Sequence, residues 1–308
     1  MEKICIILVN YNGVAYNDKC LTSIFNSTVS DKIQVVVVDN CSSDGSRESL
    51  YKKWGIDSRV HIIDMMENSG FAKANNAGIQ WARKAGISHY LLLNNDTEIA
   101  PDAVEYMWRC HETYACIVTP KIYYADQKDV LWSAGGRFTP IIKKPVQVAL
   151  NEKDTGKYNQ DRFCDCANGC ALLFDEEILQ KMGVLDESFF LYYEDTEFSM
   201  RAGKKNVPIR YCADAVVYHK VNGSTLGNQS SANVYYITRN WLIYSRLHLG
   251  WRHYLFWPYF LINRLIWMAI WLIQGKVNML DAVVSGIKDY FIWASGSIEY
   301  CDKWQRKG

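Results

Sequence analysis

Two adjacent carboxylates, Glu194 and Asp195, follow the aromatic run Phe189-Phe190-Leu191-Tyr192-Tyr193. Neighbouring carboxylates in a partly dry setting raise each other's pKa, which prepares one of them to act as a general base toward a hydroxyl group. An acidic first turn of a helix, favoured by the helix dipole, would give the same pattern. The two interpretations are compatible, because a base at the start of a helix is well positioned.

A second candidate group consists of Asp96, in Asn94-Asn95-Asp96, and His219. A carboxylate after a strand suits Mg²⁺ or Mn²⁺ that bridges to a diphosphate. His219 can complete such a metal site or donate a hydrogen bond to a phosphate. The alternatives are a simple turn before a helix near Pro101 and a structural histidine. The other five histidines are interpreted as structural.

Asp39 ends the β-branched run Val35-Val36-Val37-Val38 and is a candidate for nucleotide recognition. Its carboxylate can accept hydrogen bonds from a nucleobase imide or a ribose hydroxyl, or it can cap a turn. Asn68, Lys73 and Asn76 lie in a segment that begins as a loop, continues as a helix, and can face a sugar nucleotide. Its glycines do not form G-x-G-x-x-G, which counts against a dehydrogenase.

The elements that position these residues are predicted as βαβ units over residues 1–120, with a mainly parallel sheet. The candidate strands are Ile4 to Val9, Ile33 to Val38, Val60 to Ile63 and Tyr90 to Leu93. Ligands collect at the carboxyl ends of such strands, where the polar segments stand. We expect residues 1–120 to form a nucleotide-sugar half, 121–240 an acceptor and catalytic half, and 241–308 a helical C-terminal element.

The composition excludes some partners. The 308 residues carry 34 basic and 33 acidic side chains, and a net charge of +1 provides no field to hold nucleic acid. Ten cysteines in apolar contexts indicate buried thiols in a reducing compartment. The closest group, Cys164, Cys166 and Cys170, lacks the paired spacing of a structural zinc site. The apolar run at the N-terminus is too short for a signal peptide, so we expect a cytosolic strand there.

In this order the segments resemble glycosyltransferase family 2, and within it the rhamnosyltransferase-like branch. The resemblance covers roughly residues 4 to 245, and it is the combination that is specific. The matching segments are Leu8-Val9-Asn10-Tyr11-Asn12-Gly13, Val38-Asp39-Asn40, Asn68-Ser69-Gly70-Phe71, Asn75-Asn76-Ala77-Gly78, Asn94-Asn95-Asp96, Phe189 to Asp195, and His219.

The resemblance implies an α/β fold of the GT-A type: a Rossmann-like, mainly parallel sheet flanked by helices, here followed by an aromatic-rich helical extension. It implies that Asp39 reads the base, that Asp96 holds Mg²⁺ or Mn²⁺ with support from His219, and that Asp195 is the catalytic base beside Glu194. Donor contacts are expected from Asn10, Tyr11, Asp39, Asn68, Lys73, Asn76, Asn94 and Asn95. Further substrate contacts are expected from Asn168, Gly169 and Arg201. Asn94 replaces the first Asp of the usual D-x-D, and Thr196-Glu197 stands where Val-Asp is common.

The activity that follows from the resemblance is inverting transfer of a sugar, rhamnose favoured, from a dTDP- or UDP-sugar. The acceptor would be a hydroxyl of a bacterial cell-surface glycan or a polyprenyl-linked acceptor. Transfer of galactofuranose, glucose or galactose is the alternative, as is a non-catalytic module that binds sugar nucleotides or glycans. A sugar nucleotidyltransferase would need a Gly-rich basic phosphate loop after the first strand, and Asn10-Tyr11-Asn12-Gly13 is not one.

The C-terminal element is expected to contact the cytoplasmic face of a membrane. Between Tyr254 and Gln274 about ten Leu, Ile and Phe residues favour insertion by roughly 0.3–0.6 kcal/mol each, against about 3 for Arg264. Pro258 is expected to break or kink a long helix. This balance favours a helix that lies in the interface over one that spans the membrane. Packing of the aromatics on the catalytic domain, or on a second subunit in a homodimer, is the alternative.

Overall fold

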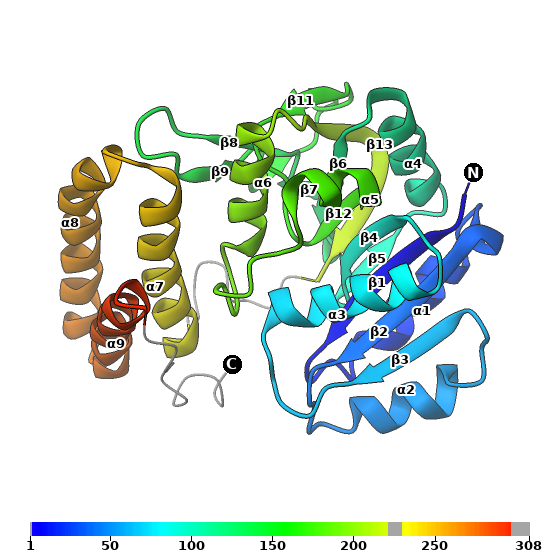
Figure 1. Cartoon of the computed structure of the whole chain (residues 1–308), viewed down its shortest axis with the longest axis horizontal. Helices are drawn as coiled ribbons and strands as arrows, with labels where there is room; N and C mark the ends of the chain where they lie inside the picture. The colour runs from blue at the N-terminus through cyan, green and yellow to red at the C-terminus, as the bar shows by residue number, and fades with distance from the viewer. Residues whose placement is uncertain (1, 221–229, 297–308) are drawn as a thin grey trace. The chain divides into compact units, whose positions relative to one another are not determined.

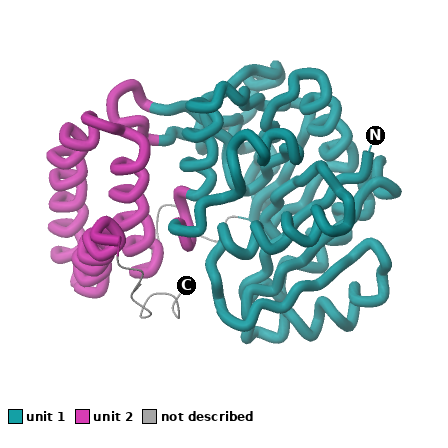
Figure 2. The backbone as a smooth tube through the Cα atoms, viewed as in Figure 1, with its two compact units in different colours: residues 1–138, 145–188, 194–221 teal, residues 139–144, 189–193, 222–308 magenta. Residues whose placement is uncertain are grey.

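The computed structural model describes residues 2–220 and 230–296, and the chain forms two compact units (Figure 1). The first, called here the sheet unit, comprises residues 1–138, 145–188 and 194–221. The second, called the helical unit, comprises residues 139–144, 189–193 and 222–308 (Figure 2). The chain therefore enters the helical unit twice, for a few residues each time, before it stays there.

Four parallel strands form the part of the sheet that the sequence predicted. They are β1 (Ile4–Asn10), β2 (Ile33–Asp39), β3 (Val60–Asp64) and β4 (His89–Asn94). Their order is β4-β1-β2-β3, and the register places Asn10 beside Asp39 and Val9 beside Asn94. The polar residues after β1, β2 and β4 therefore share one edge of the sheet, as the rule for parallel strands requires.

The rest of the sheet is mixed, because β12 (Ala171–Asp175) pairs antiparallel with β4. Beyond β12 follow β6 (Ile117–Tyr124), β7 (Gln127–Ser133) and β10 (Glu152–Lys153). The long strand β13 (Ile209–His219) runs parallel to β6 and antiparallel to β5 (Thr97–Ile99) and β11 (Arg162–Cys164). Strands β8 (Gly136–Phe138) and β9 (Pro145–Gln147) form a separate hairpin.

Two apolar layers cover the two faces of the sheet. Leu21 of α1, Leu50 of α2 and Met107 of α4 belong to one layer, and Ile79 of α3 and Phe198 of α6 to the other. The helices are α1 (Asn17–Phe25), α2 (Ser46–Trp54), α3 (Phe71–Lys84), α4 (Ala103–Tyr114), α5 (Glu176–Met182) and α6 (Glu194–Lys204), with a 3₁₀ turn at Ser30–Lys32.

The helical unit consists of α7 (Ser231–His248), α8 (Arg252–Ile273) and α9 (Val277–Ala294) with the two short segments from the middle of the chain. Helices α7 and α9 pack closely at Gly286, where a Cβ would lie 2.9 Å from the Tyr235 carbonyl oxygen. Tyr235 also donates a hydrogen bond of 2.6 Å to the Asp289 carboxylate. Small size at residue 286 therefore permits the approach of the two helices.

Two expectations for the C-terminal region differ from the structure. The helical unit includes α7 and residues from 222 onward, so it begins earlier than the expected boundary at residue 241. Helix α8 continues through Pro258, so this residue does not break the helix. Residues 1–120 and 121–220 share one sheet.

Candidate active site

Asn10 is the centre of a buried hydrogen-bond network at the strand ends. Its amide nitrogen donates to Oδ1 of Asp39 at 2.6 Å, and its Oδ1 accepts from Asn17 at 2.8 Å and from Asn95 at 3.1 Å. Oδ2 of Asp39 accepts from the backbone amide of Ser42 at 3.1 Å. Asp39 is only 1% exposed. Its carboxylate is fixed in place by these hydrogen bonds from β1 and from the loop that follows β2.

The loop after β1 passes very close to this network. A Cβ on Gly13 would lie 2.2 Å from the Asn95 amide nitrogen and 2.6 Å from Oδ1 of Asn10, so only glycine fits here. Tyr11, which precedes it in the loop, is half-buried. The sequence did not identify Asn17, whose side chain accepts a hydrogen bond of 2.8 Å from Asn95.

Asn68 lies beside the end of β2 and organises the start of α3. Asn40 donates a hydrogen bond of 2.8 Å to Oδ1 of Asn68, which also accepts from the Gly70 amide at 3.1 Å. Lys73, in the first turn of the same helix, is exposed. The structure therefore groups Asn68 with the Asp39 strand end and leaves Lys73 at the surface; donor contacts by both residues remain predictions.

Asp96 and His219 come together because β13 pairs with β5. His219 is the register partner of Thr97, and Nε2 of His219 lies 3.2 Å from Oδ1 of Asp96. The two atoms are not aligned as a hydrogen bond. Burial lowers the pKa of His219, but the neighbouring Cys170 and Asp96 side chains raise it by more, to about 10. An Asp-His pair predicted from distant segments of the sequence is thus present in the fold.

Asp96 opens onto a cleft of about 470 Å³ within the sheet unit. Tyr16 and Lys19 of the first helical segment line it, together with Tyr218 and Lys220 from the end of β13. Lys220 pairs with Asp126 across the cleft. Mixed charge, aromatic rings and an accessible carboxylate make this cleft suitable for a polar ligand that carries phosphate.

Asp195 is held by three hydrogen-bond donors. Its Oδ2 accepts from the Gly169 amide at 2.9 Å, and its Oδ1 accepts from the Thr196 amide at 2.6 Å and from the Thr196 hydroxyl at 3.2 Å. Asn168 supports this arrangement by accepting from the Cys170 amide at 2.9 Å. Burial raises the pKa of Asp195, and these donors oppose the rise. The residue nevertheless keeps partial exposure.

Glu194 is in a different environment although it is the next residue. It is 6% exposed, and its Oε2 has no hydrogen-bond partner among the described residues. Burial and the charge of Asp195 raise the pKa of Glu194 to about 8. Burial therefore favours the protonated form of Glu194, whereas the three hydrogen-bond donors favour the charged form of Asp195.

The two residues before the acidic pair have strained backbone conformations. Tyr192 and Tyr193 have φ values of 68° and 75°, which are rare for residues other than glycine. Within the helical unit, the side-chain amide of Asn240 donates to the carbonyl oxygens of Leu191 and Tyr192 at 2.8 and 2.7 Å. Such strain persists only where the surroundings enforce it, and it is typical of functional sites.

Asn76 and Arg201 make their contacts within the protein. The Asn76 amide donates to the Leu185 carbonyl and to Glu187, both at 2.9 Å, and it accepts from the Leu185 amide at 3.1 Å. Each nitrogen of Arg201 donates to Glu197 or to a backbone carbonyl of residues 182 and 184. Substrate binding by these two residues stays a prediction, and the geometry favours a structural role in holding the loop before the acidic pair.

Comparisons with known proteins identify the family of the chain. The sequence model described as "Glycosyl transferase family 2" matches residues 5–182. The low-salt glycan biosynthesis hexosyltransferase Agl10 of Haloferax volcanii is 29% identical over 242 residues, which cover 78% of this chain and 74% of that protein. The dTDP-rhamnosyl transferase RfbF of Shigella flexneri is 23% identical over 249 residues, or 78% of each chain.

Solved structures show the same fold at lower identity. GalNAc-T7, solved with UDP, GalNAc and Mn²⁺, has a TM-score of 0.60 at 14% identity over 78% of this chain and 48% of that one. S. aureus TarS has a TM-score of 0.53 at 17% identity over 78% of this chain and 39% of that one. The fold is GT-A. The chain belongs to glycosyl transferase family 2, and it is a glycosyltransferase.

Proposed function

We propose that the enzyme inverts the anomeric centre of its donor, with Asp195 as the catalytic base. The observation that carries this is the contrast within the acidic pair: Asp195 accepts three hydrogen bonds, whereas Oε2 of the buried Glu194 accepts none from the described residues. Donors to a carboxylate stabilise its charged form. Asp195 removes the proton of the acceptor hydroxyl, the oxygen attacks C1 of the sugar, and a single displacement inverts the configuration.

A divalent cation fits the residues beside the cleft. Oδ1 of Asn94 and Oδ1 of Asp96 are buried without a hydrogen-bond partner in the described ranges, and both are the hard oxygen donors that Mg²⁺ and Mn²⁺ prefer. Asp96 would hold the ion with Asn94, and His219 would orient Asp96. When bound, the ion supplies positive charge to the departing diphosphate. The Mn²⁺ in the GalNAc-T7 structure supports the use of a divalent cation.

The donor is proposed to be a dTDP- or UDP-sugar, with rhamnose favoured. The name of RfbF contains dTDP, and the structures of TarS and GalNAc-T7 were solved with UDP. These names support a donor that carries a pyrimidine nucleoside diphosphate. Asp39 would accept the imide N–H of the base or a ribose hydroxyl, because its position is fixed by Asn10. A thermal-shift screen with dTDP- and UDP-linked rhamnose, galactofuranose, glucose and galactose, with Mg²⁺ present, would rank the donors.

The acceptor is proposed to be a glycan or a polyprenyl-linked sugar at the cytoplasmic face of a membrane. Of the helices that the structure describes, α8 is the one that is long and apolar enough to cross a membrane, judged by length and composition. Its Arg264 is only 9% exposed and lies over the rings of Trp241 and Phe260, so the charge does not interrupt the exposed apolar side chains of the helix. We propose that α8 lies on the membrane surface and places the enzyme beside a lipid-linked acceptor.

Three substitutions test the mechanism. Asp195→Asn keeps shape but cannot take the proton, so turnover should fall by about 10²-fold or more while nucleotide affinity stays nearly constant. Asp96→Asn should weaken metal-dependent donor binding as well as turnover, because it acts on the diphosphate. Glu194→Gln should cost less than Asp195→Asn. Transfer by Asp195→Asn at the wild-type rate would overturn the assignment of the base.

A further inference from the structure

Arg264 of α8 is a buried cation without a hydrogen-bond acceptor. It is 9% exposed, and its buried Nε has no partner among the described residues. The other two guanidinium nitrogens form no hydrogen bond with those residues either, but they retain access to solvent. The rings of Trp241 and Phe260 lie 5.3 and 5.7 Å from its Cζ. Ring faces attract a cation, yet they offer no oxygen to its N–H groups, which remain available to a ligand.

The other buried Lys and Arg side chains of the described ranges have oxygen acceptors. Lys121 donates a hydrogen bond of 3.1 Å to Asp154, and Nε of Arg239 donates one of 2.9 Å to Oδ1 of Asn240. A buried charge without such a partner is costly to the fold. The lack of a protein acceptor at Arg264 therefore points to an anionic ligand, because anions form the strongest hydrogen bonds with a guanidinium.

Further donors lie around the same rings. Nε1 of Trp241 is buried and has no hydrogen-bond partner in the described part of the chain. Nζ of Lys144 lies 5.9 Å from the centroid of the Trp241 ring and forms no ion pair with a described residue. Burial lowers the pKa of Arg264, and Tyr193 and Tyr259 oppose this change, so both side chains lie near it. These five residues, called here the Arg264 cluster, hold two positive charges and no carboxylate.

The surroundings of the Arg264 cluster favour a phosphate that is attached to a lipid. Leu261 precedes Arg264 by three residues, which places it on the same side of α8, and it is 45% exposed. Leu265, the next residue along the helix, is 63% exposed. Apolar surface therefore adjoins the guanidinium. The described part of the helical unit is also basic, with two acidic side chains, Asp281 and Asp289, against eight basic ones: Lys143, Lys144, Arg239, Arg246, Arg252, Arg264, Lys276 and Lys288.

We propose that the Arg264 cluster binds the phosphate group of a lipid-linked acceptor, an inference that rests on the transfer to such an acceptor proposed above. The guanidinium donates two parallel hydrogen bonds to the phosphate oxygens, and Lys144 adds a second positive charge. The lipid chain lies along the exposed leucines of α8. Tyr193 is followed in the sequence by Glu194 and Asp195, so the cluster includes the segment that leads to the proposed base.

Isothermal titration calorimetry of the full chain with farnesyl diphosphate, a short and soluble isoprenyl diphosphate, tests the site. EDTA is present so that no metal ion holds the diphosphate at Asp96. We expect Arg264→Gln to raise the Kd about tenfold or more, because charge-assisted hydrogen bonds are lost. Farnesol, which lacks the phosphate, should bind to the wild type more weakly by a similar factor. Arg252→Gln is the matched control on the same helix and should keep the wild-type Kd, because this arginine lies over a different ring, that of Trp251.

Thermal unfolding verifies that the variants are folded. Arg264→Gln is expected to fold, because it removes a charge that has no acceptor among the described residues. Arg264→Lys is a second variant that keeps the charge, and it should also weaken binding, because an ammonium group cannot replace the planar fork. Equal Kd values in Arg264→Gln and Arg252→Gln would overturn the proposal. So would equal binding of farnesol and farnesyl diphosphate, or no binding of farnesyl diphosphate by the wild type.

Vesicles of phosphatidylglycerol distinguish the acceptor from the bilayer as the source of the phosphate. If the cluster binds the acceptor, Arg264→Gln should sediment with these vesicles as the wild type does. Loss of sedimentation with an unchanged Kd for farnesyl diphosphate would assign Arg264 to a bilayer headgroup and would overturn the proposal. The titration contains neither donor nor metal ion, so its failure leaves the assignment of Asp195 as the base unaffected, and a failure of that assignment leaves the measured Kd unchanged.

Discussion

The backbone amide of Gly169 donates a hydrogen bond of 2.9 Å to Oδ2 of Asp195, and a Cβ on this glycine would lie 3.2 Å from the Cβ of Asp195. The absence of a side chain therefore lets the chain approach the proposed base. Gly169→Ala should displace the carboxylate by a few tenths of an ångström and lower kcat by about tenfold or more, since small displacements of catalytic groups are costly. Steady-state kinetics with the preferred donor will measure this.

The matched control is Gly203→Ala, near the end of the same helix as Asp195. An added Cβ there has no atom within 4 Å among the described residues. We expect unchanged kcat and a stability gain of roughly 0.5–1 kcal/mol, because alanine is the better helix former. An equal loss of kcat in both variants would show that the contact with Asp195 is not the cause.

Glu194 should give the free energy of unfolding a distinctive dependence on pH. Its pKa in the folded state is about 8, raised by burial and by Asp195, whereas an unfolded Glu titrates near about 4.3. Between these values the folded protein holds a proton that the unfolded chain has released. Stability contributed by this group is therefore present at low pH and is lost as pH rises toward 8.

Urea unfolding of the wild type and of Glu194→Gln, at intervals from pH 5 to 8.5, will test this dependence. The wild type should lose up to a few kcal/mol relative to the variant over that range. Glu48→Gln, at an exposed position, should follow the wild-type curve. Parallel curves for the wild type and Glu194→Gln would show that the folded-state pKa is ordinary.

Asn240 should matter for the loop that leads to the acidic pair. Asn240→Ala removes both donors to the Leu191 and Tyr192 carbonyls, and each lost bond costs roughly 1 kcal/mol or more when the acceptor stays buried. We expect a stability loss of about 2–4 kcal/mol with a fall in kcat, because the strained tyrosines lose their support. Asn233→Ala, on the same helix, is the control. Its free energy of unfolding and its kcat are measured beside those of Asn240→Ala. Wild-type kcat in a folded Asn240→Ala would contradict this role.

The exposed side of α8 should bind lipid. Leu261, Leu265 and Ile273 are 45%, 63% and 86% exposed, so replacing all three with Gln should leave the fold intact. We expect the wild type to sediment with vesicles of anionic phospholipid and the triple variant to remain in the supernatant. Glu98→Gln, in the sheet unit, serves as the control. Unchanged sedimentation together with a change from dimer to monomer would assign this surface to a second subunit.

Local pattern was sufficient to predict the parallel part of the sheet. The strands at Ile4, Ile33 and Val60 begin where predicted. The continuous aliphatic runs of the first two are buried within the sheet, whereas the strand at Val60 lies at its edge and is only partly buried. The adjacency of Asn10 and Asp39 follows from that register. Residue type and position at a strand end predicted that Asp96 and His219 act together, and the family resemblance implies the same pairing.

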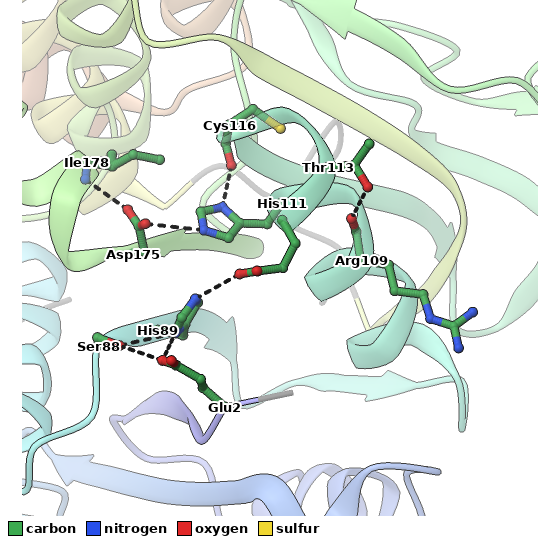
Figure 3. A network of polar contacts seen from close by, with 10 residues as sticks. Glu2, Ser88, His89, Arg109, His111, Thr113, Cys116, Asp175 and Ile178 are labelled. Carbon is green, nitrogen blue, oxygen red and sulfur yellow. Dashed lines mark hydrogen bonds and ion pairs between the residues drawn. The ribbon is translucent and has the colours of Figure 1, made fainter.

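Long-range contacts account for what the sequence did not reveal. Asn76 donates a hydrogen bond to the carbonyl oxygen of Leu185, over a hundred residues away in the sequence. Nothing in the residues around Asn76 distinguishes a side chain that holds this loop from one that contacts a ligand. Asn240 was missed for the same reason, since it stands in an apolar helix without a motif. His89 and His111 are likewise separated in the sequence, and the packing of α4 on the sheet brings their rings together (Figure 3).

The composition of the helical unit has a consequence for synthesis of the chain. Residues 139–144 and 189–193 belong to it, yet their partners on α7 and beyond are translated later. At about 5–20 residues per second, the loop before Glu194 waits on the order of seconds for Asn240 and the rest of α7. The sheet can form during that interval, but the strained tyrosines cannot be held. Asp195 should therefore be the last of the proposed catalytic residues to reach its final position. Ribosome-bound chains halted before α7 should carry a folded parallel sheet without transferase activity.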